Sequence, residues 1–124
     1  MIDLEALNKA IKLIDGQDTN NDKISEGLKI LESFDISKAD IDLKIEILYY
    51  EAIAQTHLKK FKEASSNLQK VIQLQPDNHK AQDHLRKVTN IINGKEDNNL
   101  GGFVLGGAVT ILGAIALGLF LNKK

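Results

Sequence analysis

Residues 48–78 read LYYEAIAQTHLKKFKEASSNLQKVIQLQPDN, and their apolar residues recur every three or four positions. This spacing is typical of amphipathic α-helices, and no alternation typical of β-strands competes with it. Lys59, Lys60 and Lys62 mark a solvated turn between two helices, and Pro76 lies at or just past the end of the second helix. The sequence therefore predicts a helical hairpin here. A lesser interpretation of the three lysines is attraction to anionic lipid headgroups.

The same helical spacing continues on both sides of this hairpin. Counting its two helices, the chain contains five apolar stripes, which are Leu4, Leu7, Ile11 and Ile14; Ile24, Leu28, Leu31 and Phe34; Ile41, Ile45, Leu48 and Ala52; Phe61, Ala64, Leu68 and Ile72; and Ala81, Leu85, Val88 and Ile92. Short connections between such helices favour antiparallel hairpins that bury a face by stacking on one another. We therefore expect an all-α domain of about five helices over residues 1–93.

Composition excludes several classes of protein. The chain has 124 residues and a net charge of −1, which fits one small domain and argues against nucleic acid as a partner. The absence of cysteine excludes disulfide scaffolds, thiolate zinc sites and cysteine nucleophiles. No two of the three histidines have the i, i+4 spacing of a helical metal site, and neither Ser65 nor Ser66 lies in a glycine-flanked nucleophile elbow. We expect no metal, no cofactor and no enzymatic activity.

Residues 100–121 form a segment without charge. The segment contains 12 large apolar residues, six glycines, three alanines and one threonine. As a helix it would be about 33 Å long, which matches the roughly 30 Å hydrocarbon core of a bilayer. We expect a single transmembrane tail anchor, preceded by a linker over 94–99 and followed by a short basic tail over 122–124. Because residues 1–93 carry no secretory signal, we expect that domain in the cytosol.

Small residues recur every fourth position within this segment. They are Gly102, Gly106, Thr110, Ala114 and Gly118. Such a stripe permits two membrane helices to approach closely, which predicts a homo-oligomer formed through the anchor. The alternative is that the glycines only lower the hydrophobicity of the anchor and so affect which membrane accepts it.

Residues 48–78 resemble one tetratricopeptide repeat. The matching positions are Leu48, Ala52, Phe61, Ala64, Leu68, Pro76 and Asn78. The earlier residues Ile24, Gly27 and Leu31 echo Phe61, Ala64 and Leu68 at an offset of 37 positions. Residues 4–34 therefore resemble a degenerate first repeat with a longer inner loop, and the fifth helix would cap the stack.

The whole arrangement resembles the mitochondrial fission 1 protein family. The most telling segments are ISEGLKILESF (24–34), LKKFKEASSNLQKVIQLQPDNHKA (58–81) and GGFVLGGAVTILGAIALGLFLNKK (101–124). The resemblance implies an adaptor on the cytosolic side of the mitochondrial outer membrane, and also on peroxisomes. Its expected partner is a dynamin-related GTPase or an adaptor of that GTPase. The sequence begins almost directly in the first repeat, where members of the family usually carry an additional helix and arm.

Tetratricopeptide hairpins line a concave groove with their first helices, and partner peptides bind there. We expect this groove to present residues from the first and third helices, namely Asn8, Lys12, Glu46, Tyr49, Ile53 and Thr56. In this interpretation Tyr49 and Ile53 are exposed apolar anchors for the partner. The alternative is that Tyr49 and Ile53 pack under the first helix as core.

Other functions fit part of the same pattern. A tail-anchored tetratricopeptide co-chaperone receptor would need a carboxylate clamp of lysines and asparagines, but Tyr49 and Tyr50 occupy the central groove region where an asparagine is wanted. A third alternative is a structural, peptide-binding membrane module in a bacterium.

Overall fold

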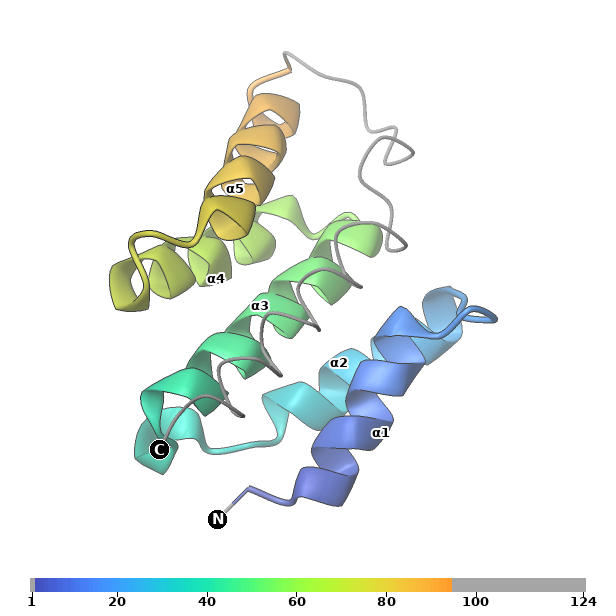
Figure 1. Ribbon diagram of the computed structural model, residues 1–124. Coiled ribbons are helices and arrows are strands. Elements are labelled where there is room, and N and C mark those ends of the chain that lie inside the picture. Colours follow the sequence, from blue (N-terminus) through green and yellow to red (C-terminus); the bar gives the residue numbers. More distant parts are fainter. Residues whose placement is uncertain (1, 95–124) are drawn as a thin grey trace.

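The computed structural model describes residues 2–94, and these residues form five α-helices without a β-strand (Figure 1). The helices are α1 (Leu4–Asp15), α2 (Asn21–Glu32), α3 (Ile41–His57), α4 (Phe61–Leu74) and α5 (His79–Ile92), with a short 3-10 helix η1 (Ile36–Lys38) before α3. The predicted all-α class and the five predicted helices are confirmed within this range.

The predicted membrane segment lies outside the described residues. This holds for residues 100–121, for the short tail 122–124 and for the small-residue stripe Gly102, Gly106, Thr110, Ala114 and Gly118. Within residues 2–94, every helix is too short or too polar to cross a bilayer.

Most of the helices begin at a side chain that caps the first turn. Asp3, Asn20, Asp40 and Asn78 each accept a hydrogen bond from a backbone N–H of the helix that follows, at 2.9 to 3.0 Å. Such caps satisfy donors that the first turn otherwise leaves open, so the local sequence itself fixes where these helices start. The exception is α4, which begins after Lys60 without a side-chain cap.

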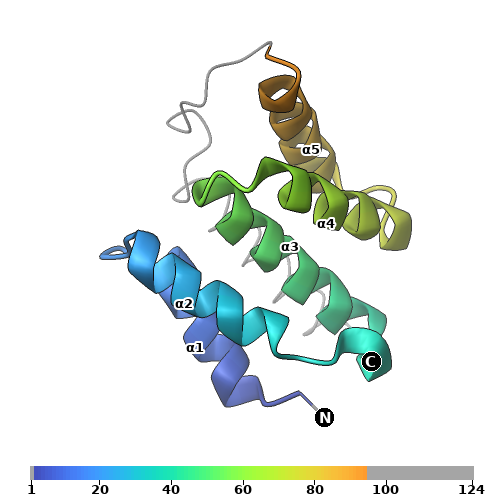
Figure 2. The same cartoon turned by 180° about the vertical axis from the view of Figure 1, so that it is seen from behind.

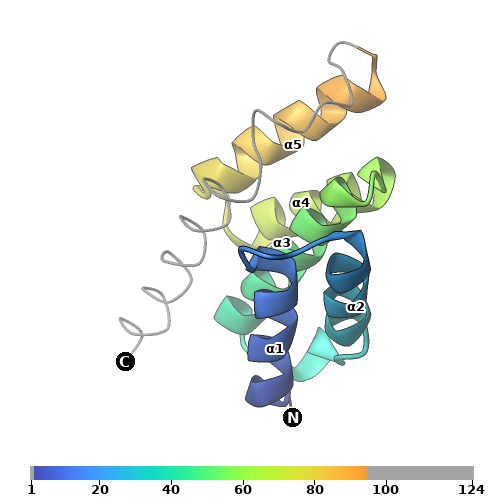
Figure 3. The ribbon, with the colours of Figure 1, turned by 90° about the vertical axis from the view of Figure 1, so that its right-hand side faces the viewer.

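The helices stack as two antiparallel hairpins and a fifth helix. Helix α1 packs against α2, and α3 packs against α4. Helix α2 also contacts α3, and α5 packs on α4 at the far end of the stack (Figures 2 and 3). Since short loops join each pair, neighbouring helices in the sequence are also neighbours in space.

Helix α3 lies at the centre of this stack and is buried on all sides. Of the stripe that the sequence predicted on α3, Ile45, Leu48 and Ala52 are buried, whereas Ile41 is exposed at the start of the helix. The structure also buries apolar residues outside that stripe, namely Ile47, Tyr49, Tyr50, Ile53 and Ala54. A helix with apolar residues on several sides needs several neighbours. Helix α3 packs against α4 of its own hairpin and against α2 of the first hairpin, and it also contacts α1 and His84 of α5.

The first hairpin is held close by a glycine. A Cβ atom placed on Gly27 would lie 2.8 Å from Cγ1 of Ile14 and 2.9 Å from the backbone oxygen of Ala10. Helix α2 therefore approaches α1 more closely than any larger residue would allow. In the second hairpin, the small residue Ala64 of α4 is fully buried.

Candidate functional site

The four predicted groove residues on α3 are buried within the folded chain. Tyr49 is 1% exposed, Ile53 and Thr56 are 2% exposed, and Glu46 is 7% exposed. The expectation that Tyr49 and Ile53 are exposed apolar anchors is therefore wrong. The physical reason is the central position of α3, which places this side of the helix in the core instead of on a free surface.

Tyr49 and Thr56 contact His84 of α5. The ring centroids of Tyr49 and His84 are 5.8 Å apart with a tilt of 55°, and Oγ1 of Thr56 lies 3.1 Å from Nε2 of His84. The Thr56 hydroxyl also donates to the backbone oxygen of Ala52 at 2.8 Å, which leaves it to accept from Nε2 of His84. These contacts join α3 to α5.

His84 is neutral at physiological pH. Its burial, with smaller contributions from the nearby charges of His57 and Lys87, lowers the pKa of His84 to about 4. A neutral ring of this kind donates one hydrogen bond and packs against an aromatic ring, as it does here with Thr56 and Tyr49. The geometry therefore gives His84 a structural role.

A second polar cluster joins α3 to α4. The side-chain amide of Asn67 donates to Oε1 of Gln55 at 3.0 Å and to Oε1 of Glu51 at 3.2 Å. Burial, with a smaller contribution from the nearby charge of Glu32 and against the opposing charge of Lys70, raises the pKa of Glu51 to about 7. Burial likewise raises the pKa of Glu46 to about 7. Both carboxyl groups are thus less acidic than usual, and the Glu51 carboxyl is tied to a neighbouring helix.

Replacing Glu51 with glutamine should stabilise the fold in a pH-dependent way. Because the folded-state pKa of about 7 lies above the ordinary value of 4.5, ionisation of Glu51 opposes folding. This penalty is absent below about pH 4.5 and fully present above about pH 7. At about pH 8 we expect Glu51→Gln to raise the free energy of unfolding by about 1–2 kcal/mol, after allowing for partial solvent screening.

Urea unfolding of both proteins at about pH 4.5 and about pH 8 measures this difference. The glutamine keeps the side-chain oxygen that accepts from Asn67, so the variant changes the charge and little else. The same stability difference at both pH values would contradict the prediction.

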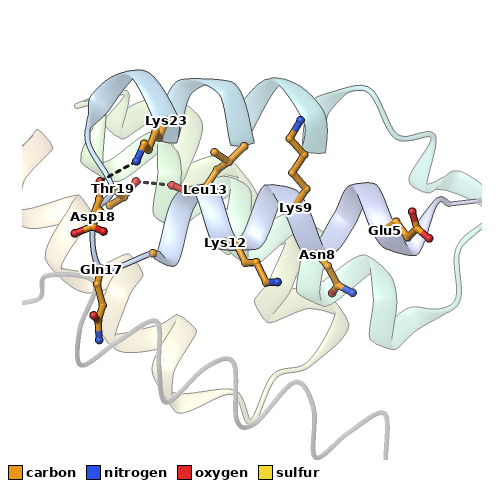
Figure 4. Close-up of a pocket in the computed structure, with 10 residues that line it drawn as sticks. Glu5, Asn8, Lys9, Lys12, Leu13, Gln17, Asp18, Thr19 and Lys23 are labelled. Carbon is orange, nitrogen blue, oxygen red and sulfur yellow. Dashed lines mark hydrogen bonds between the residues drawn. The ribbon is translucent and has the colours of Figure 1, made fainter.

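The two predicted groove residues on α1 are exposed and line one open cavity. Asn8 and Lys12 project from the same side of α1, while Thr19 and Lys23 lie where the loop leads into α2 (Figure 4). The cavity has a volume of about 570 Å³, and ten residues line it. They are Glu5, Asn8, Lys9, Lys12, Leu13, Gly16, Gln17, Asp18, Thr19 and Lys23.

Three lysines and the carboxylates of Glu5 and Asp18 line this cavity. Lys9 pairs with Glu26 at 3.8 Å, and Nζ of Lys23 donates to the backbone oxygen of Asp18 at 3.3 Å. Lys12 forms no ion pair within residues 2–94 and stands one helical turn from the amide of Asn8. An ammonium group beside an amide can bind a carboxylate or a phosphate.

The sequence pointed to only part of this cavity. Lys9 lies next to Asn8 on the polar face of α1, so the helical spacing of polar residues could have included it. Thr19 could not have been found in this way, because periodicity does not describe a loop, and Lys23 lies in the first turn of a different helix, α2. The loop is held by a hydrogen bond from the Thr19 hydroxyl to the backbone oxygen of Leu13.

A metal centre is not formed by the described part of the chain. Within residues 2–94 no three side chains of the histidine, aspartate and glutamate types come together in a way that could hold an ion.

Comparisons with protein-family models, with curated proteins and with solved structures give no match for this chain. The class that the fold and the cavity define is a small all-helical domain with an open, polar, partly basic cavity on its first hairpin.

Proposed function

We propose that this chain is a non-enzymatic adaptor that recruits the fission machinery to mitochondria and to peroxisomes. In this proposal residues 100–121 anchor it in the outer membrane, the helical domain faces the cytosol, and the recruited partner is a dynamin-related GTPase or an adaptor of that GTPase. The observation that carries the proposal is the order of two stacked helical hairpins and a fifth helix, followed in sequence by 22 uncharged residues.

The hairpins support a tetratricopeptide-like architecture. In this proposal α1 and α2 form the first repeat, α3 and α4 form the second, and α5 caps the stack. Gly27 and Ala64 occupy equivalent places in the two proposed repeats, and both are small; Gly27 lies close to α1, and Ala64 is fully buried on α4. This equivalence is what two repeats of one supersecondary unit would give.

The partner would bind at the cavity on α1. The burial of Tyr49 and Ile53 removes them as partner contacts, whereas Asn8 and Lys12 are exposed. Lysines bind carboxylates through charge-assisted hydrogen bonds, so an acidic segment of the partner fits this cavity. Lys12 would supply the charge and Asn8 the directional hydrogen bond.

A co-chaperone receptor is the second candidate, because the cavity places lysines beside an asparagine. A clamp of this kind would recognise the free carboxylate at the end of a chaperone tail. The position where a clamp asparagine is wanted on α3 is instead occupied by buried Tyr49. The test compares a peptide that has a free C-terminal carboxylate with the same peptide as its amide. At least tenfold tighter binding of the carboxylate form, a difference of about 1.4 kcal/mol, would favour this candidate.

Rescue of organelle length tests the adaptor function. Disruption of the protein should lengthen mitochondria, and the full chain should restore their length. Lys12→Glu should fail to restore it, because a carboxylate then faces the acidic partner. The matched control is Lys29→Glu, because Lys12 and Lys29 are both exposed and both lie in the last turn of a 12-residue helix. Both variants thus lose the same favourable interaction with the helix dipole.

The outcomes separate the function from the site. Unchanged organelle length after disruption would overturn the fission role. Equal rescue by Lys12→Glu and Lys29→Glu would retain the role and overturn the cavity on α1 as its binding site.

A further inference from the structure

We propose that the turn between α3 and α4, together with the end of α5, forms a surface that lies on anionic lipid headgroups. We call this surface the lysine patch, and it consists of Lys59, Lys60, Phe61, Lys62 and Ile92. The inference rests on the proposed membrane anchor and adds a second contact between the protein and the bilayer.

The lysine patch combines positive charge with exposed apolar surface. Its five residues and Glu63 line a shallow cavity of about 350 Å³. Its three lysines are exposed, and Ile92 is 41% exposed although it is a large apolar residue at the end of a helix. Phe61 is partly buried against the core. Basic side chains around an apolar centre are typical of surfaces that bind at a membrane interface.

The charge of the patch is not compensated within the described chain. None of its three lysines forms an ion pair in residues 2–94, and Glu63 is the one carboxylate among the residues that line the cavity. Three lysines within four positions give a local positive potential that attracts anionic lipids of the cytoplasmic leaflet. The turn itself is well defined, because Lys59 has a φ of 63° and its N–H donates to the backbone oxygen of Thr56 at 3.0 Å.

The position of the patch in the chain brings it close to the proposed membrane span. Seven residues separate Ile92 from Leu100, where the uncharged segment begins. Eight extended steps of the chain reach at most about 28 Å. The end of α5 is therefore within about 28 Å of the membrane entry point, which is comparable to the size of the domain itself. Lipid is thus the surface that this patch would meet at high local concentration.

A single fluorescent label can report the contact. The chain has no cysteine, so Ile92→Cys in the full chain gives one attachment site for an environment-sensitive probe. The labelled chain is reconstituted into vesicles of phosphatidylcholine alone or with phosphatidylserine. The control label is Lys38→Cys, which is exposed in η1 at the opposite end of α3. A helix of 17 residues places the two ends of α3 about 25 Å apart.

We expect the Ile92 probe to brighten and shift to the blue in vesicles with phosphatidylserine, and the Lys38 probe to remain unchanged. Replacing Lys59, Lys60 and Lys62 with glutamine should lower the ratio of docked to undocked patch by about fivefold per lysine at low salt. High salt should reverse the docking, because it screens exposed charges.

Vesicle flotation separates the possible failures. If the full chain does not float with either kind of vesicle, both the anchor and the lysine patch are overturned. If it floats but the Ile92 probe stays in water, or responds equally in neutral vesicles, the anchor stands and the anionic lipid contact is overturned. A response that needs an added acidic peptide would replace the lipid surface with a protein partner.

Discussion

Replacing Tyr49 with alanine is expected to lower the free energy of unfolding by about 3–5 kcal/mol. Tyr49 is 1% exposed, and its ring packs against His84 of α5. Truncation would leave a cavity between the central helix and the last helix and would remove a buried aromatic contact. Urea unfolding of the full chain, followed by circular dichroism, measures the change.

The control for this prediction lies on the same helix. Ile41 is 54% exposed, so Ile41→Ala should change stability by no more than about 0.5 kcal/mol. Equal stability of Tyr49→Ala and Ile41→Ala would show that Tyr49 contributes little to the core. The groove interpretation of Tyr49 would then return.

Replacing Gly27 with valine should lower the free energy of unfolding by about 2–3 kcal/mol. Its Cβ would overlap with Cγ1 of Ile14 and with the backbone oxygen of Ala10, and a backbone atom cannot move aside cheaply. Helices α1 and α2 would have to separate, which would loosen the first hairpin along its length. The cavity on α1 would change with them.

A valine elsewhere shows whether this loss comes from contact or from helix propensity. Ser66 is exposed on α4, so Ser66→Val introduces the same β-branched residue at an exposed helical position. We expect it to cost no more than about 0.5 kcal/mol. Similar losses at Gly27 and Ser66 would argue against the close approach of α1 and α2.

The sequence predicted the helices well because their signals are local. Each of the five apolar stripes lies within one helix, so helical spacing alone indicates it. These stripes gave the number of helices and their approximate positions.

The site was predicted less well because it depends on contacts between helices. Tyr49 and Thr56 are buried where they contact His84, which lies 28 residues after Thr56 in the sequence. Helical spacing within α3 does not reveal a contact over such a distance. One usable signal was present, because the apolar residues of α3 are spread around the helix instead of along one stripe, which is typical of a central helix. The structure also buries the polar residue Gln55, whose side-chain oxygen accepts a hydrogen bond from Asn67 of α4.

We propose above that residues 100–121 hold a helical adaptor on a membrane. Alkaline carbonate extraction of cells that express either the full chain or a variant without residues 100–121 measures this attachment. We expect the full chain to stay in the membrane pellet and the shortened chain to move to the supernatant. Release of the full chain by carbonate would show that residues 100–121 do not span the membrane.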